Sequence, residues 1–199
     1  MKEKIILIGG GGHCRACIDV IEQEGKYDIV GILDTSKRVG KKIMNYEIIG
    51  IDQDIPKFKN NVSNFFITIG QIKSPQKRII LYETIKKVSG KLPVIVSPLA
   101  YVANSAKIGE GTIVMHHSLV NASAYIGKNC IINSKALIEH DAMIGDHCHI
   151  STASVINGDV KVGEKTFFGS GAISLHGARV PPNSFIKANT LFLSKPIED

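Results

Sequence analysis

Residues 126–150 read IGKNCIINSKALIEHDAMIGDHCHI, and an isoleucine returns at every sixth position of this stretch. Neither an α-helix nor an ordinary strand has a period of six. That period is typical of a coil in which three short strands form a triangle and the aliphatic side chain fills its centre. The stretch therefore predicts a hexapeptide β-helix.

The same repeat extends from this stretch in both directions. Thirteen of the fifteen positions at this spacing from Val102 to Ile186 are Val or Ile. Small residues stand two positions before most of them, and glycines recur directly after several of them. Fifteen repeats, taken three to a coil, predict five coils. We expect residues 97–199 to form an all-β left-handed parallel β-helix domain.

The first half of the chain alternates strands and helices instead. Four apolar runs predict buried strands, at 4–9, 28–34, 64–70 and 92–96. Residues 36–60 predict loops with a short strand. This alternation predicts an α/β, Rossmann-like domain over residues 1–96, with a small parallel sheet.

Two helices are expected between these strands. Apolar spacing predicts the first from His13 to Gly25, where the glycine serves as the C′ residue. For the second, Ser74 is the expected N-cap and Pro75 the first helical residue, and the helix ends near Gly90.

Composition and charge limit the class of protein. A chain of 199 residues with 44% hydrophobic and 21% charged residues is typical of a globular protein. No apolar run approaches the roughly 20 residues of a membrane span, and no secretory signal is evident, so we expect a cytoplasmic protein. The net charge of +6 suits a phosphorylated small molecule or a solvated surface. Basic tracts interleaved with aromatic residues are absent from the sequence, so no nucleic-acid partner is expected.

The four cysteines have two different settings. Cys130 and Cys148 occupy the small interior position of the repeat, 18 residues apart, so we expect free thiols stacked in adjacent coils. Cys14 and Cys17 form a C-x-x-C after a strand, where a redox motif would lie. They also share one helical face, which favours packing, and the redox interpretation remains the alternative.

The chain resembles the bacterial sugar acyltransferases of the sialic-acid O-acetyltransferase and amino-sugar N-acetyltransferase type. The resemblance rests on GGGGH (9–13), LDT (33–35), ITIGQIKSP (67–75), the hexapeptides and IEHD (138–141). It implies acetyl transfer from acetyl-CoA, without a metal, to a nucleotide-linked amino sugar or a sialic-acid-like sugar. It also implies a homotrimer with active sites in the grooves between copies.

The glycine loop is the expected substrate-binding element. A dinucleotide fingerprint would require a third glycine where Cys14 stands, so NAD is weakly indicated. The resemblance instead implies that a nucleotide-sugar binds to Gly9, Gly11, Gly12, His13 and Asp34. Backbone N–H groups at a helix N-terminus can bind its pyrophosphate. Relatives acting on UDP-sugars often have a second acidic residue where this chain has Thr35, which leaves the nucleotide open.

Acetyl transfer requires a base that takes a proton from the attacking group. Histidine suits this task near neutral pH, and an adjacent carboxylate can hold its tautomer. His140 and Asp141 match the base and acidic partner of the family, with Glu139 as a competing partner. The resemblance also implies a substrate contact at Asn133.

Acetyl-CoA is expected along the outside of the coil. The resemblance implies coenzyme contacts at five residues: His149, Asn157, Gly158, Gly171 and Ala172. The C-terminal FIKANTLFLSKPIED lacks the proline loop that covers the coenzyme in many relatives. His147 is expected to be solvated surface, as are His116, His117 and His176. The adjacent pair His116–His117 departs from the repeat, which suggests a groove position for it.

Two other classes of function remain open. A zinc enzyme resembling the gamma-type carbonic anhydrases would bind zinc through histidines across a subunit boundary, with His140, His147 and His149 as the candidate ligands. A non-catalytic protein of a sugar pathway would keep the coil without the chemistry. Zinc content would identify the first class, and the absence of acceptor-dependent CoA release would identify the second.

Overall fold

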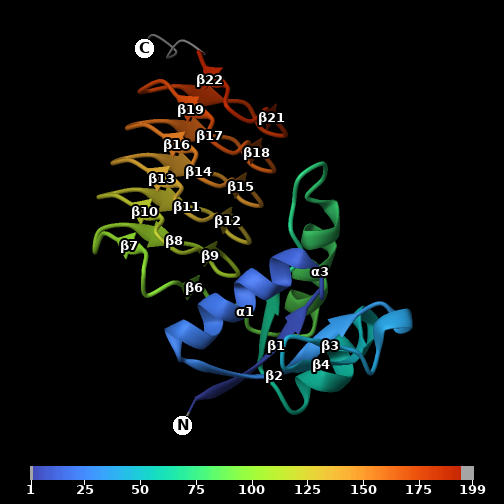
Figure 1. Ribbon diagram of the computed structural model, residues 1–199. Helices are drawn as coiled ribbons and strands as arrows, with labels where there is room; N and C mark the ends of the chain where they lie inside the picture. The colour runs from blue at the N-terminus through green and yellow to red at the C-terminus, as the bar shows by residue number, and fades with distance from the viewer. Residues whose placement is uncertain (1, 194–199) are drawn as a thin grey trace.

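The computed structural model describes residues 2–193, and an N-terminal α/β region lies against one end of a long triangular coil in it (Figure 1). The N-terminal sheet has the strand order β3-β4-β2-β1-β5, parallel except for β3. Its strands are β1 (Glu3–Ile8), β2 (Tyr27–Asp34), β3 (Lys42–Ile43), β4 (Tyr46–Ile51) and β5 (Asn64–Ile67). The helices are α1 (Gly12–Glu24), α2 (Ile55–Lys59) and α3 (Gln76–Lys87), with short 3₁₀ turns η1 (Ser36–Arg38) and η2 (Asp52–Asp54).

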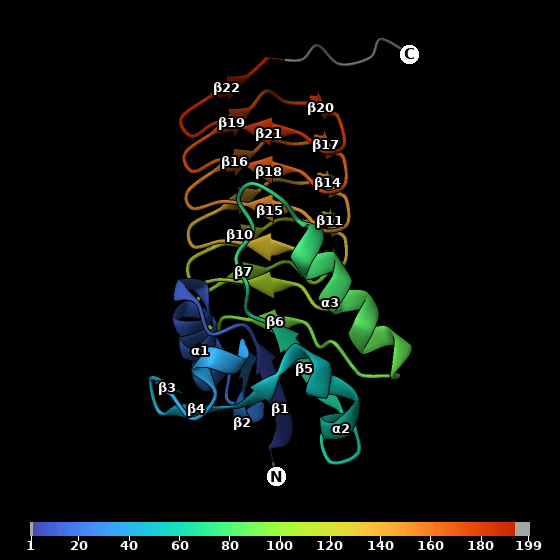
Figure 2. The ribbon, with the colours of Figure 1, turned by 90° about the vertical axis from the view of Figure 1, so that its right-hand side faces the viewer.

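The coil consists of two-residue parallel strands stacked in three sheets, as in a left-handed β-helix (Figure 2). We call the first sheet the covered face: β6 (Ile95–Val96), β9 (Ile113–Val114), β12 (Ile131–Ile132), β15 (His149–Ile150), β18 (Phe167–Phe168) and β21 (Phe185–Ile186). The second is the apolar face: β7 (Tyr101–Val102), β10 (Leu119–Val120), β13 (Leu137–Ile138), β16 (Val155–Ile156), β19 (Ile173–Ser174) and β22 (Leu191–Phe192). The third face contains β8 (Lys107–Ile108), β11 (Tyr125–Ile126), β14 (Met143–Ile144), β17 (Lys161–Val162) and β20 (Arg179–Val180).

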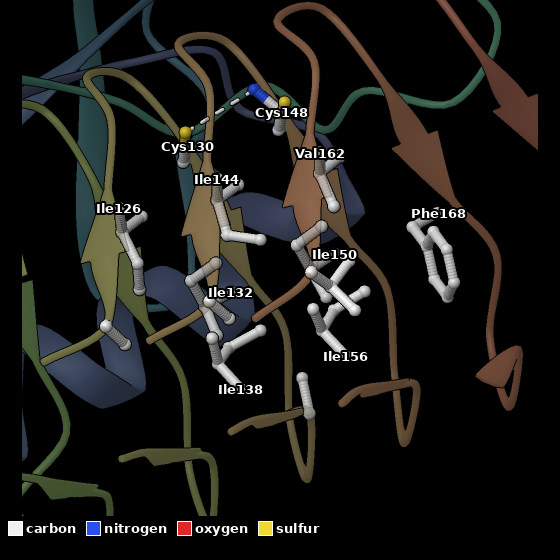
Figure 3. Packing of buried hydrophobic residues seen from close by; sticks show 14 of the residues in the cluster. Ile126, Cys130, Ile132, Ile138, Ile144, Cys148, Ile150, Ile156, Val162 and Phe168 are labelled. Atoms are coloured by element: carbon white, nitrogen blue, oxygen red, sulfur yellow. Dashed lines mark hydrogen bonds between the residues drawn. The ribbon is translucent and has the colours of Figure 1, made fainter. Parts of the chain in front are cut away.

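The second residue of each coil strand points inward, which explains the period of six. Figure 3 shows these aliphatic side chains stacked in the centre of the coil, most of them fully buried. Cys130 and Cys148 are buried free thiols in adjacent coils, and the Cys148 N–H donates to the Cys130 Sγ over 3.4 Å. The predicted fold class and the stacked thiols are confirmed.

The N-terminal region covers the first strands of one face of the coil. Ile113 and Ile131 point outward from the covered face, and both are buried against the apolar residues of α1. Cys14 and Cys17 belong to the same cluster, fully buried. Burial raises the pKa of both thiols. Redox chemistry needs an accessible thiolate, so the packing interpretation of this C-x-x-C is favoured.

The first residue of each strand on the apolar face is a large apolar side chain that points outward. These residues are Tyr101, Leu119, Leu137, Val155, Ile173 and Leu191, all exposed or half-buried. A row of outward apolar side chains of this kind makes the face a candidate interaction surface. No helix in residues 2–193 is long and apolar enough to cross a membrane.

Three details of the N-terminal region differ from the sequence prediction. Residues 95–96 form β6, which pairs with β9 of the coil, so the prediction of a fourth strand in the N-terminal sheet is wrong. The domain boundary after residue 96 stays a prediction. Pro75, rather than Ser74, is the N-cap of α3, although the Ser74 Oγ accepts a hydrogen bond from the Gln76 N–H. Residues 36–60 hold the β3–β4 hairpin and α2 besides the expected loops.

Candidate functional site

His140 and Asp141 form an exposed pair at the corner where the chain passes from β13 to β14. The His140 Nδ1 lies 2.8 Å from the Asp141 Oδ2, and the two side chains are 53% and 60% exposed. The hydrogen bond to Asp141 raises the pKa of His140. A carboxylate acceptor at Nδ1 selects the tautomer whose Nε2 is free to take a proton.

Glu139 has a different partner from the one considered above. Its Oε2 accepts a hydrogen bond from the Asn121 Nδ2 over 2.8 Å and a longer one, of 3.3 Å, from the His140 main-chain N–H. The His140 imidazole instead faces Asp141. The geometry therefore favours Asp141 over Glu139 as the residue that orients the His140 imidazole.

The corner that carries His140 is occupied in successive coils by residues 18 positions apart. We call Ala122, His140, Gly158 and His176 the His140 corner. Main-chain hydrogen bonds join the coils at this corner: the Asp159 N–H donates to the His140 carbonyl oxygen, and the Gly177 N–H donates to the Gly158 carbonyl oxygen. The His140 and His176 rings lie on either side of Gly158, with centroids 6.2 Å apart.

His149 and Asn133 lie elsewhere, on the side of the coil beneath the N-terminal region. His149 is 6% exposed, its Nε2 accepts from the Asn133 Nδ2 over 3.1 Å, and its Nδ1 donates to the Gln71 carbonyl oxygen. Burial lowers the pKa of His149 to about 4. This histidine is therefore a neutral hydrogen-bonding group that ties the coil to the 69–72 loop.

Arg78 of α3 holds the same loop in place. Its guanidinium donates to the carbonyl oxygens of Ile67 and Ile69 and, over 2.7 Å, to the Asn129 Oδ1 of the coil. A buried arginine needs several acceptors to offset the loss of water. These bonds join the end of β5 to the coil, so the 69–72 loop has a defined position between the two regions.

The glycine loop lines a cavity of about 590 Å³, a size that suits a small ligand. Its walls come from the loop, the end of β2 and the 69–72 loop: Gly9, Gly10, Gly11, Gly12, His13, Asp34, Arg38, Ile69, Gly70, Ile72 and Lys77. Gly11 is the N-cap of α1, and side chains at Gly11 or Gly12 would meet open space. The N-terminus of α1 therefore opens into the cavity.

Asp34 braces the glycine loop. One carboxylate oxygen accepts from the Gly10 N–H over 2.9 Å and from the Arg38 Nη1 over 2.5 Å, and the other from the Thr35 N–H over 2.7 Å. Arg38 also donates to the Gly10 carbonyl oxygen. Asp34 lines the cavity but is already bonded within the chain, whereas Arg38 adds a cation that the sequence analysis had not singled out.

His13 lines the cavity at the first turn of α1. It is largely buried, which lowers its pKa to about 3, and its Nε2 makes no hydrogen bond in the part of the chain that the structure describes. A buried polar atom without a partner costs free energy unless a ligand or water supplies one. His13 is therefore a neutral imidazole in the cavity wall, with one buried ring nitrogen that has no partner.

The residues expected to bind the coenzyme lie at two corners. Asn157 and Gly158 stand at the His140 corner, where the Asn157 Nδ2 donates to the Ser174 carbonyl oxygen. Gly171 and Ala172 lie between the covered and apolar faces, and their N–H groups donate to Thr152 and Gly169. Ala172 is fully buried in the coil, so its side chain has no free surface. Residues 194–199 of the C-terminal segment lie outside the described residues.

Two histidines expected at the surface are packed instead. His147 is 9% exposed, bonds the Asn129 side chain and packs edge-on against Tyr82. His116 joins the two regions, with 2.6 Å from its Nδ1 to the Ser97 Oγ and 2.6 Å from its Nε2 to the Asp19 Oδ2. The surface prediction was wrong for both, because the N-terminal region covers their side of the coil.

The zinc interpretation requires three histidines that converge. His147 and His149 already bond to amide groups beneath the N-terminal region, and His140 lies at the corner between the other two faces. No group of three or more potential ligands converges within residues 2–193. Within the described part of one chain, the three histidines therefore do not form that metal site.

Comparison with known proteins adds a second line of evidence. Residues 4–85 match the model of the PglD N-terminal domain, and residues 123–158 match that of the bacterial transferase hexapeptide (six repeats). A histidine-to-asparagine variant of perosamine N-acetyltransferase from Caulobacter crescentus, in complex with CoA and GDP-perosamine, superposes with a TM-score of 0.90 at 27% identity. The match covers 97% of this chain and 90% of that one. The chain therefore contains a match to the PglD N-terminal domain and one to the transferase hexapeptides, and its fold matches that of a hexapeptide-type sugar acyltransferase.

Two further similarities support fewer conclusions about this chain. The acetyltransferase domain of PglB from Neisseria gonorrhoeae, in complex with acetyl coenzyme A, has a TM-score of 0.90 at 24% identity, covering 98% and 93% of the two chains. At this identity it supports the acyltransferase fold alone. An uncharacterized protein of Acanthamoeba polyphaga mimivirus is 33% identical over 120 residues, or 59% of this chain. The chain spans only 22% of that relative's length.

The sequence analysis missed two residues of the candidate site. Gln71 lies in the GQIKSP motif that carried the resemblance, yet its bonds to His147 and His149 depend on how the two regions pack. Arg38 follows the strand-end aspartate by four residues, a spacing that would bring it back to Asp34 in a helical turn. That spacing was the available signal for Arg38.

Proposed function

We propose that the chain transfers the acetyl group of acetyl-CoA to a nucleotide-linked sugar, with His140 as the general base. The observation that carries the proposal is the exposed His140–Asp141 pair, in which Asp141 bonds the His140 Nδ1 and leaves Nε2 to take a proton. Neighbouring structures that contain CoA or acetyl coenzyme A support the choice of co-substrate.

The proposed reaction is a direct attack. The acceptor's amine or hydroxyl attacks the thioester carbonyl carbon while the His140 Nε2 takes its proton. When the C–S bond breaks, the CoA thiolate leaves and takes the proton from the His140 imidazolium. Asp141 stabilises that imidazolium, consistent with the raised pKa of His140. Coenzyme contacts are proposed at Asn157 and Gly158 of the same corner and at Gly171.

The acceptor is proposed to bind in the glycine-loop cavity. The N-terminus of α1, Arg38 and Lys77 give this cavity positive charge that suits a diphosphate. The unbonded His13 Nε2 suits a sugar hydroxyl or amine. The named activity of the Caulobacter relative favours an amino sugar over a sialic-acid-like acceptor.

We propose that the working form is a homotrimer, because one copy leaves its site incomplete. The covered face packs against the N-terminal region that holds the cavity, whereas the His140 corner joins the other two faces of the triangle. Base and cavity of one chain therefore lie on opposite sides of the coil. A second copy packed on the apolar face would bring its own cavity toward this corner, and CoA would lie in the groove between them.

The test measures CoA release from acetyl-CoA with UDP-, GDP- and dTDP-linked amino sugars and with free sialic acid as acceptors. His140→Ala is expected to lower the acceptor-dependent kcat by about 10²–10⁴-fold. His117→Asn serves as the control, since His117 is exposed at another corner with φ 58°, which asparagine tolerates.

Two outcomes would overturn the proposal. A His140→Ala rate within about threefold of the unsubstituted enzyme would remove His140 as the base, since general-base catalysis contributes far more. No acceptor-dependent release with any of these sugars would favour the non-catalytic alternative.

A further inference from the structure

A second cavity opens beside the glycine-loop cavity, between α3 and the 3₁₀ turn η2. We call it the α3 groove; it has a volume of about 360 Å³, and its walls are Asp52, Gln53, Lys77, Ile80, Leu81 and Thr84. The four α3 residues follow helical spacing and lie on one face of the helix. Asp52 and Gln53 come directly after the end of β4. Open α/β sheets bind ligands at the carboxyl ends of their strands, so the groove lies at the binding end of this sheet.

The α3 groove and the glycine-loop cavity are adjacent. Lys77 lines both of them, and its Nζ lies 3.9 Å from the Asp52 Oδ2. Burial raises the pKa of Asp52, and the Asp34 carboxylate of the glycine-loop cavity is near enough to raise it further. A ligand longer than either cavity can therefore extend from one into the other past Lys77.

Asp52 brings an unbonded carboxylate to the α3 groove. Its side chain is 29% exposed, and within residues 2–193 it caps no backbone N–H and has the ion pair with Lys77 as its contact. Asp54 holds the turn instead, since its Oδ2 accepts from the Ile51 N–H over 2.9 Å. The local structure thus uses Asp54 and leaves both oxygens of Asp52 available to a ligand.

Ile80 gives the same groove an apolar wall. Its side chain is 55% exposed, whereas Leu81 beside it is buried. A flat ring placed against Ile80 would remove this apolar surface from water, which is favourable. The Thr84 Oγ1 already donates to the Ile80 carbonyl oxygen over 2.7 Å. The groove therefore combines an apolar surface for the face of a ring with a carboxylate for donors at its edge.

We propose that the α3 groove binds the nucleobase of the nucleotide-linked acceptor and that Asp52 selects guanine. This inference rests on the proposed function, in which the diphosphate lies at the glycine loop. Guanine presents two parallel donors, N1–H and N2–H, on one edge, and the two oxygens of a carboxylate accept both. Uracil and thymine have a carbonyl oxygen on each side of their N3–H, and cytosine has an acceptor nitrogen beside its amino group. The Asp52 carboxylate repels these acceptors, so the preferred acceptor is a GDP-linked sugar.

The experiment measures binding of GDP, UDP and xanthosine diphosphate to the full chain by isothermal titration calorimetry. GDP is expected to bind about tenfold or more tightly than UDP, the scale of hydrogen bonds to a charged group. Asp52→Asn should remove this preference and bind xanthosine diphosphate more tightly than GDP. Xanthine has a carbonyl oxygen in place of the guanine amino group, so its edge pairs with an amide. A gain of this kind cannot come from a misfolded variant.

Glu83→Gln is the matched control, because Glu83 is an exposed carboxylate of the same helix outside the groove. Its preference for GDP over UDP should equal that of the unsubstituted chain. Equal affinities of the unsubstituted chain for GDP and UDP would overturn the assignment, as would a GDP preference that Asp52→Asn leaves within about threefold of its original value. Both results leave the nucleotide-linked acceptor in place. Failure of all three diphosphates to bind would overturn that acceptor as well.

Discussion

His140 and the pair His13–His149 are the same residue type in opposite environments. His140 is half exposed at an outer corner, where the hydrogen bond to Asp141 raises its pKa. His13 and His149 are buried around the 69–72 loop, and burial lowers their pKa to about 3 and about 4. The corner thus holds a group that can accept a proton, and the interior holds groups that stay neutral.

This difference assigns proton transfer to the exposed histidine and ligand binding to the buried ones. A neutral buried imidazole offers one donor and one acceptor in fixed positions, which suits recognition of a sugar and support of a loop. An exposed imidazole beside a carboxylate suits proton transfer. Since the two environments lie on opposite sides of one coil, the comparison predicts that neighbouring copies combine them.

The largest expected effect comes from separating those copies. Leu137→Arg places a charge in the middle of the apolar face, where Leu137 is half-buried and points outward. Because the side chain lies outside the coil's interior, we expect the fold to persist, the trimer to dissociate and acceptor-dependent activity to fall below about 1%, given the penalty for burying an unpaired charge. Light scattering and CoA release measure the two effects. Lys107→Arg, on the third face, is the control.

A fully active Leu137→Arg monomer would contradict the proposal that neighbouring copies combine base and cavity, because the two would then have to meet within one chain. An active trimer would remove the apolar face as the interface and leave the rest of the proposal in place.

Asp141→Asn is expected to have the next largest effect, about 10–100-fold on kcat. The φ of 60° at this position suits asparagine, so the change removes the charge without straining the turn. Since Asp141 raises the pKa of His140, its removal lowers that pKa. The acidic limb of the kcat/KM profile, which reports the neutral base, should therefore move to lower pH. An unmoved limb with a reduced rate would assign that limb to another group.

The coil was predictable from the sequence because each hexapeptide points one side chain into the interior, so an aliphatic residue recurs at every sixth position. His140–Asp141 was predictable for the same reason, since neighbours at one corner are neighbours in the chain. The buried state of His147 and the link from His116 to Asp19 were not, because they depend on which coil face the N-terminal region covers. The hexapeptide pattern does not indicate which coil face contacts the N-terminal region. The prediction for residues 92–96 was wrong for a related reason. A short apolar run is compatible with a strand of the N-terminal sheet and with a strand of the coil, and the sequence does not distinguish the two.

The glycine-loop cavity supplies a smaller effect, on binding alone. Gly11→Asp adds a carboxylate at the N-cap of α1, where the side chain meets open space, and it should repel a diphosphate. We expect the KM for the nucleotide-sugar to rise about tenfold or more, with the KM for acetyl-CoA unchanged. Gly11→Ala is the uncharged control. Equal effects from both variants would show that space, rather than charge, governs this position.

The buried histidines also make stability depend on pH, which is the smallest of these effects. In the unfolded chain His13 and His149 become protonated near pH 6.5. In the folded chain their pKa values are lowered to about 3 for His13 and about 4 for His149. Their contribution is therefore complete above pH 6.5 and is lost as the pH falls toward those values. Each adds a slope of up to about 1.4 kcal/mol per pH unit.

Urea unfolding at intervals from pH 7.5 to pH 5 measures this slope. His149→Gln should reduce it, because one titrating group is removed while a hydrogen-bonding side chain remains. His140→Ala is the matched control: the raised pKa of His140 favours the folded state at low pH, so its loss should leave the decline in place or steepen it. If His149→Gln and His140→Ala changed the slope alike, the two histidine environments would not differ in the way that their burial requires.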